Sequence, residues 1–312
     1  CSLPHPTDAP LCPQPGPPHA MEPNHKMCEM DVFDAAVDGA TLLISLCGLV
    51  GNGAVLWLLG CRIRRNPVTV YVLNLAVADF TFLLFMLTYT LLNLLKDLSC
   101  STLPISVKHL VSLLLPLLFA HNMGMYLLAA ISIEKCVSIL CPLWYRCRRP
   151  QHLSAVVCAL GLLWVFSGSL VSFITFGAVA VAICVTFSSM MLISNLSLLI
   201  KLQRGFRRRH PEKLYVAVLI NVIFFFVFAI PFSMEAFLNL AGGLQFLPEG
   251  TSLLLAMLNS SINPVIYFLV GCCRQRCSLR SVTAALRRVF EEKVTSEEGS
   301  PESEDQVAET TA

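Results

Sequence analysis

The longest stretch without a charged residue sets the first constraint on the fold. Leu153–Ile200 runs for 48 residues without Asp, Glu, Lys or Arg. One α-helix of that length would extend about 72 Å, more than twice the roughly 30 Å hydrocarbon core of a bilayer. The stretch therefore predicts two successive membrane-spanning helices, with a reversal of direction near Gly177.

Other runs are also long and apolar enough to cross a membrane. They are Gly39–Gly60, Val68–Leu95, Leu110–Ile133, Lys213–Ala241 and Thr251–Val270. Only 13% of the residues are charged, whereas a soluble domain carries about 25% because water must wet its surface. The sequence predicts an all-α membrane protein whose seven-transmembrane helix bundle occupies residues 38–270.

The distribution of basic residues predicts the orientation of the chain. With the N-terminus outside, 19 of the 22 lysines and arginines lie in inner segments, and only Lys26, Lys96 and Lys108 lie outside. Basic residues gather on the cytoplasmic side of membrane proteins. We expect a multi-pass plasma-membrane protein with residues 1–37 extracellular and the C-terminus cytosolic. Residues 1–20, which precede the first Met, are either a genuine extracellular tail or upstream sequence.

The segment after the last span, residues 271–290, is amphipathic. Its apolar residues recur at helical spacing among arginines: Leu279, Val282, Leu286 and Val289. This pattern is typical of a short helix on the cytosolic membrane surface. Cys272, Cys273 and Cys277 lie beside it, where juxtamembrane thiols can be palmitoylated. Residues 291–312 are acidic and polar, which predicts a disordered cytosolic tail.

A carboxylate lies inside the second span, at Asp79. Ionisable groups in lipid are costly and usually serve a function. The last span offers Asn259, Ser260 and Asn263 as polar partners, and Asn52 of the first span can join them. A buried carboxylate without a cation binds a sodium ion, takes up a proton, or stays neutral and bonded to amides. All three interpretations are open.

Polar residues and prolines recur at distinctive places in the spans. They are Asn52 in GN, Asp79 in LAVAD, Trp164, Pro231 and the run Asn263-Pro264-Val265-Ile266-Tyr267. This order resembles the rhodopsin-like (class A) G-protein-coupled receptors. More narrowly, WLLGCRIRRNPVTVYVLNLAVADF, PLWYRCRRPQHLSAVVCALGLLW and NSSINPVIYFLVGCCRQR are similar to the Mas-related receptors. The resemblance covers residues 42–290.

The resemblance implies a receptor that transmits binding of an extracellular peptide, amine or small metabolite to heterotrimeric G proteins. Arrestin and receptor kinases are implied as further partners, whereas no cofactor, resident metal or nucleic acid is. In such receptors an acid–arginine pair at the inner end of the third helix latches the resting state. Here Glu134 is followed by Lys135, which lacks the planar fork of arginine. Glu134 can still latch onto a cytosolic cation.

The resemblance also implies where the helices move. Pro231 is expected to weaken the sixth helix, and Asn263, Pro264 and Tyr267 are expected to rearrange in the seventh. No Trp stands two residues before Pro231, and Leu110 occupies the place where most such receptors carry a cysteine bonded to the second outer loop. These departures fit the Mas-related group.

An outward-opening ligand pocket is implied between the helices. Its candidate residues are His121, Asn122, Phe232, Glu235 and Tyr89. Glu235 would favour a cationic ligand if it points inward, and otherwise it reaches the outer water. His121 is either a ligand contact or a hydrogen-bonded core residue.

The second outer loop is almost missing, because Phe176-Gly177-Ala178 is all that separates the two spans. Either the outer mouth is bare, or the loop is incomplete in this sequence. Other classes of protein fit less well. A transporter would show internal repeats and broken helices, and an enzyme would show a nucleophile–base pair or a metal-ligand spacing, so no enzyme is expected. A non-signalling or weakly coupling relic is the remaining alternative.

Overall fold

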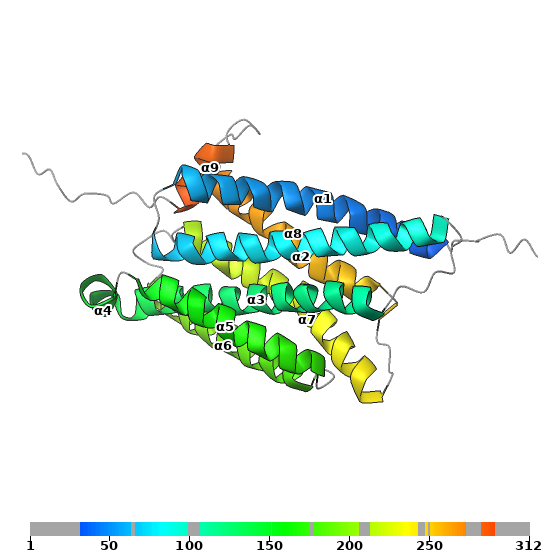
Figure 1. Cartoon of the computed structure of the whole chain (residues 1–312). Coiled ribbons are helices and arrows are strands. Elements are labelled where there is room, and N and C mark those ends of the chain that lie inside the picture. The colour runs from blue at the N-terminus through cyan, green and yellow to red at the C-terminus, as the bar shows by residue number, and fades with distance from the viewer. Residues whose placement is uncertain are drawn as a thin grey trace, which may run out of the picture.

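The computed structural model describes residues 32–63, 66–98, 107–150, 152–174, 178–205, 213–242, 247–248, 250–272 and 282–290. Within these ranges the chain is helical and contains no strand (Figure 1). The helices are α1 (Val32–Cys61), α2 (Pro67–Leu98), α3 (Val107–Leu140), α4 (Pro142–Cys147), α5 (Leu153–Ile174), α6 (Ala178–Gly205), α7 (Lys213–Gly242), α8 (Thr251–Cys272) and α9 (Val282–Phe290).

Seven helices of the described residues are long and apolar enough to cross a membrane: α1, α2, α3, α5, α6, α7 and α8. The predicted seven-helix, all-α membrane fold is confirmed. The uncharged stretch Leu153–Ile200 does divide in two, since α5 ends at Ile174 and α6 begins at Ala178. The connecting residues 175–177, which carry the predicted reversal near Gly177 and the short outer loop, lie outside the described residues.

Helix α3 lies in the middle of the bundle, where it contacts α2, α5, α6 and α7 (Figure 1). One close approach is between α3 and α5. The Tyr126 hydroxyl donates to the Val157 carbonyl oxygen at 2.8 Å, and a Cβ on Gly161 would collide with the Tyr126 ring. Glycine is therefore required at this position, because any side chain would push α5 away from α3.

Helix α2 begins with an N-terminal cap. Asn66 and Thr69 bond reciprocally, each backbone N–H donating to the other side chain at 2.8 Å, and Pro67 occupies the first turn. Such a cap satisfies donors that the helix leaves unpaired. The Asn66 side chain also donates to the carbonyl of Phe290 at 2.9 Å, which ties α9 to the α1–α2 connection.

Helix α9 lies at the same end of the bundle as α4 (Figure 1). Its buried residues form an apolar face: Ala285, Leu286, Val289 and Phe290. Arg287 and Arg288 are exposed. A Cβ on Gly271 would collide with the backbone of Ala285, so the end of α8 and α9 touch main chain to main chain. Helix α9 is amphipathic, and residues 273–281 of the predicted segment lie outside the described residues.

Some expectations lie outside the described residues. These are the extracellular tail up to residue 31, the acidic tail at 291–312, and Cys273 and Cys277. Cys272 ends α8 and is half-buried. Helix α1 begins at Val32, before the apolar run Gly39–Gly60.

Candidate functional site

The buried polar residues of α1, α2 and α8 meet in the middle of the bundle. The Asn263 amide donates to Asp79 Oδ2 at 2.7 Å, and the Asn52 amide donates to the Ser260 carbonyl at 3.1 Å. Asn52, Asp79 and Asn263 are at most 3% exposed. Asn259, the other predicted member, is also buried. The structure therefore brings Asp79 of α2 and Asn263 of α8 into contact and bonds Asn52 of α1 to the same stretch of α8.

The second oxygen of Asp79 faces α3 at a glycine. A Cβ on Gly124 would lie 3.7 Å from Asp79 Oδ1, so any side chain there would fill the space beside the carboxylate. No lysine or arginine of the described residues forms an ion pair with Asp79. Carboxylate and hydroxyl oxygens are the ligands that a hard cation such as sodium prefers, and the Ser260 side chain also bonds to Asp79. Asn263 presents its amide N–H to the carboxylate, so Asp79 and Ser260 are the residues here whose oxygens fit the expected ion.

Glu134, near the C-terminal end of α3, is held by an arginine from the α4–α5 connection. Arg149 Nε donates to Glu134 Oε1 at 2.7 Å, and both side chains are less than a tenth exposed. The same guanidinium donates through Nη2 to the Ser154 hydroxyl at 2.5 Å and lies 5.3 Å from the centre of the Tyr145 ring. The cation that the sequence left unnamed is therefore Arg149, which reaches back 15 residues.

Tyr145 and Lys135 are neighbours of Glu134, the first in space and the second along the helix. Burial and the nearby Glu134 carboxylate raise the pKa of Tyr145 above its ordinary value, so its hydroxyl keeps its proton at neutral pH. Lys135 is buried and 7% exposed. Adjacent residues of a helix point about 100° apart, so Lys135 presents its charge to a different part of the inner face than Glu134 does.

Tyr267 near the inner end of α8 bonds to α7. Asn221 Nδ2 donates to the Tyr267 hydroxyl at 3.2 Å, and the Tyr267 ring packs edge-on against Phe290 at 5.3 Å between centroids. Both Asn221 and Tyr267 are at most 3% exposed. Asn221 was not predicted as a site residue, because its sequence neighbours give no sign that it faces α8. Pro231 and Pro264 both lie inside helices, α7 and α8 respectively.

His121 lies between aromatic rings from α2 and α7. Its ring is 4.9 Å from that of Phe232, in an edge-on arrangement, and 5.8 Å from that of Phe82. It is 8% exposed, and its Nε2 has no hydrogen-bond partner among the described residues. Leaving a buried polar atom unpaired costs about 1–3 kcal/mol. His121 and Phe232 are thus together, with an unused hydrogen-bonding atom between helices.

The other predicted ligand residues are placed differently. The Asn122 amide donates to the Ser169 hydroxyl of α5 at 3.1 Å, so it joins two helices. Glu235 is buried and its Oε2 accepts from the backbone N–H of Leu247 at 3.2 Å, which ties α7 to the segment before α8. Tyr89 is half-buried on α2, two turns beyond Phe82 on the same face.

Comparison with known proteins identifies the group to which this arrangement belongs. Residues 30–179 match the family model of the serpentine type 7TM GPCR chemoreceptor Srbc. The chain is 39% identical to human Mas-related G-protein coupled receptor member X1 over 286 residues, 83% of this chain and 84% of that protein. It is 38% identical to human member X2, covering 80% of this chain and 82% of the relative.

A further relative is the mouse proto-oncogene Mas, which is 36% identical over 80% of this chain and 82% of its own length. These similarities each cover at least 80% of this chain. The chain therefore belongs to the Mas-related G-protein-coupled receptors, multi-pass receptors of the plasma membrane that couple to G proteins.

Proposed function

We propose that the receptor binds its extracellular ligand between the outer halves of α2, α3 and α7, against His121 and Phe232. Support comes from the unpaired Nε2 of His121, because a ligand group that hydrogen-bonds to it would remove the cost of burying it. Tyr89 extends the site outward, and the carboxylate of Glu235 gives it a preference for cationic groups. Asn122 supports the site by holding α5 against α3. The ligand is a peptide, an amine or a small metabolite.

The inner half of the molecule acts as the switch. Glu134 and Arg149 form the resting latch, and Lys135 meets the G protein once the latch opens. Ligand binding selects an arrangement in which α7 bends at Pro231. The bond from Asn221 to Tyr267 must then change, because it joins the inner ends of α7 and α8.

The polar cluster around Asp79 would hold a sodium ion in the resting state. Asp79 would supply the charge, and Asn259 and Asn263 would supply amide oxygens once the Asn263 amide, which donates to Asp79 here, had turned, because oxygen ligands suit hard cations. The rearrangement of Asn263 and Pro264 in α8 would then alter the donor set. The ion supplies charge compensation to a carboxylate that is buried in the bundle.

The two ends of the chain lie on opposite sides of the membrane. The N-terminus is extracellular and the C-terminus is cytosolic, because the basic residues gather at the end that carries α4 and α9 (Figure 1). Receptor kinases would act on serines and threonines of the acidic tail at 291–312, and arrestin would follow. Palmitate on Cys272, Cys273 or Cys277 would fasten the start of the tail to the inner leaflet.

The observation that carries the proposed switch is the buried Glu134–Arg149 ion pair. It joins the membrane-crossing α3 to a cytosolic connection, where a G protein would bind. The direct test is guanine-nucleotide exchange by purified G proteins, with the full-length receptor in lipid nanodiscs. Exchange above empty nanodiscs is expected, and Lys135→Arg should increase it because the guanidinium fork bridges several acceptors. Lack of exchange with every G-protein class, in both variants, would refute the proposal.

A further inference from the structure

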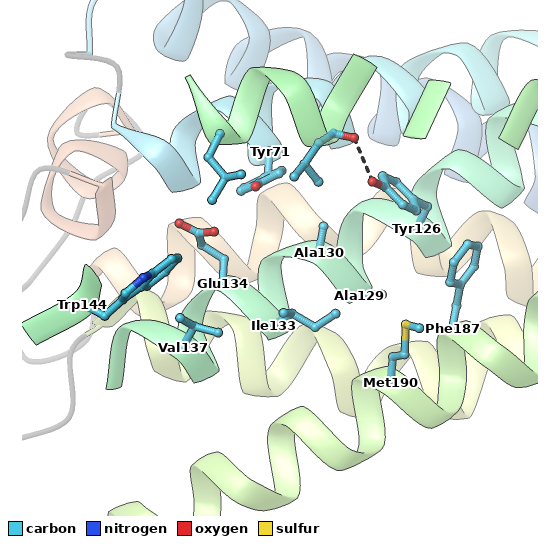
Figure 2. A pocket seen from close by; sticks show the side chains of 12 residues that line it. Tyr71, Tyr126, Ala129, Ala130, Ile133, Glu134, Val137, Trp144, Phe187 and Met190 are labelled. Carbon is cyan, nitrogen blue, oxygen red and sulfur yellow. Dashed lines mark hydrogen bonds between the residues drawn. The ribbon is translucent and has the colours of Figure 1, made fainter. Parts of the chain in front are cut away.

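A cavity lies away from the proposed ligand site, along the half of α3 that follows Tyr126. It is a crevice of about 240 Å³ between α3, α5 and α6, and residues of α2 and α4 close its inner end (Figure 2). Neither His121 nor Phe232 lines it, and Tyr126, the lining residue of α3 that is nearest to His121 in the sequence, is five residues away. The crevice is therefore a separate feature that the proposed ligand site does not use.

The crevice opens toward lipid. Ile133 of α3 and Met190 of α6 line it and are 39% and 44% exposed, and Trp144 of α4 is 43% exposed. Both α3 and α6 cross the membrane. The exposed sides of such helices face acyl chains, so a ligand of this crevice enters from the bilayer.

The apolar part of the crevice has the shape for a flat, rigid body. Ala129 and Ala130 give it a low floor on α3, and Tyr126 and Phe187 stand beside the floor (Figure 2). The two aromatic rings pack edge-on at 5.6 Å between centroids. Tyr126 already donates its hydroxyl to Val157, so its ring is fixed and its polar end needs no further partner. A fused ring system fits this surface better than a flexible chain does, since it loses less entropy on binding.

The polar lining residues at the inner end of the crevice are Glu134, Tyr71 and Trp144. The carboxylate of Glu134 faces it, with the Trp144 indole on the far side (Figure 2). Because Arg149 already compensates the charge of Glu134, a second cation is not required there. An anionic phosphate or fatty acid would find no free cation there either, because the guanidinium of Arg149 is already bonded to Glu134 and Ser154. A neutral hydroxyl can donate to a carboxylate oxygen, and it would do so close to the cytosolic end of the span.

We propose that this crevice binds a membrane sterol from the inner leaflet. The ring system lies over Ala129 and Ala130, and the single hydroxyl points toward Glu134. The ligand contacts α3, α5 and α6 together, so it stabilises their packing. The proposal concerns binding alone and does not depend on the outer ligand site or on the switch.

The test uses the full-length receptor in nanodiscs with a photoreactive alkyne sterol. Labelled peptides should come from α3 and α6, and excess unlabelled cholesterol should compete. Met190→Trp fills the crevice from its exposed rim without disturbing the core, and should weaken labelling roughly tenfold. Ile193→Trp is the matched control, since Ile193 is 65% exposed on the same helix and does not line the crevice. It should label like the unmodified receptor.

A second variant and a second measurement protect against a folding defect. Ala130→Phe raises the floor and should also abolish labelling, in protein that remains monodisperse. Added cholesterol should raise the melting temperature of the unmodified receptor and of Ile193→Trp, but not that of Met190→Trp. Equal labelling of Met190→Trp and Ile193→Trp would overturn the proposal. Preferential labelling of the crevice by a photoreactive phospholipid or diacylglycerol would also overturn it.

Discussion

Near the C-terminal end of α3, the Glu134 carboxylate is held by the Arg149 guanidinium from the α4–α5 connection. Arg149 bonds to Glu134 and Ser154 together, so it fixes the α4–α5 connection against α3. Breaking one partner of a buried ion pair leaves an uncompensated charge and costs about 3–5 kcal/mol. Loss of a pair that forms in the resting state destabilises that state relative to the active state.

Arg149→Ala should therefore raise ligand-independent G-protein activation several-fold, since every 1.4 kcal/mol shifts an equilibrium about tenfold. The measurement is G-protein dissociation in transfected cells, normalised to receptor at the cell surface. Arg148→Ala is the matched control, because Arg148 is exposed. Equal basal activity of the two variants at equal surface expression would show that the pair is no latch.

The unpaired Nε2 of His121 leads to a substitution that should stabilise the receptor. His121→Phe keeps the ring between Phe82 and Phe232 and removes the buried polar atom, so it should stabilise the receptor by about 1 kcal/mol. Asn122→Leu, one position along α3, breaks a satisfied bond to Ser169 and should destabilise it by about the same amount. Thermal unfolding of purified receptor checks both. Destabilisation by His121→Phe would mean that Nε2 is satisfied in the resting protein.

Helix α9 meets the end of α8 in a close approach at Gly271. It packs its apolar face on the bundle, and its first contact with α8 is at Gly271, against the main chain of Ala285. The Asn66 bond to Phe290 and the edge-on contact of Phe290 with Tyr267 hold its other end. A side chain at position 271 would separate the two helices at their closest point.

Gly271→Val should therefore detach α9, and amide hydrogen exchange of residues 282–290 should become faster because local opening costs less. Gly60→Val is the control, since a Cβ on Gly60 meets nothing within 4 Å. Unchanged exchange in Gly271→Val would mean that α9 adapts without leaving the bundle.

The arrangement of the whole molecule could be predicted where it depends on hydropathy and charge. The uncharged stretch Leu153–Ile200 required two spans, and two helices are present. The amides near Asp79 could also be anticipated, because they stand in apolar runs. Arg149, Asn221 and Ser169 could not be assigned as partners. Their contacts arise from the packing of helices that are far apart in the sequence, and their own neighbours resemble many other polar positions.

The central claim is that the chain crosses the membrane seven times, with its basic end in the cytosol. Epitope tags at the two ends of the receptor test it in cells. The account predicts that an antibody stains the N-terminal tag on intact cells and the C-terminal tag only after permeabilisation. Staining of both tags on the same side of the membrane would contradict it.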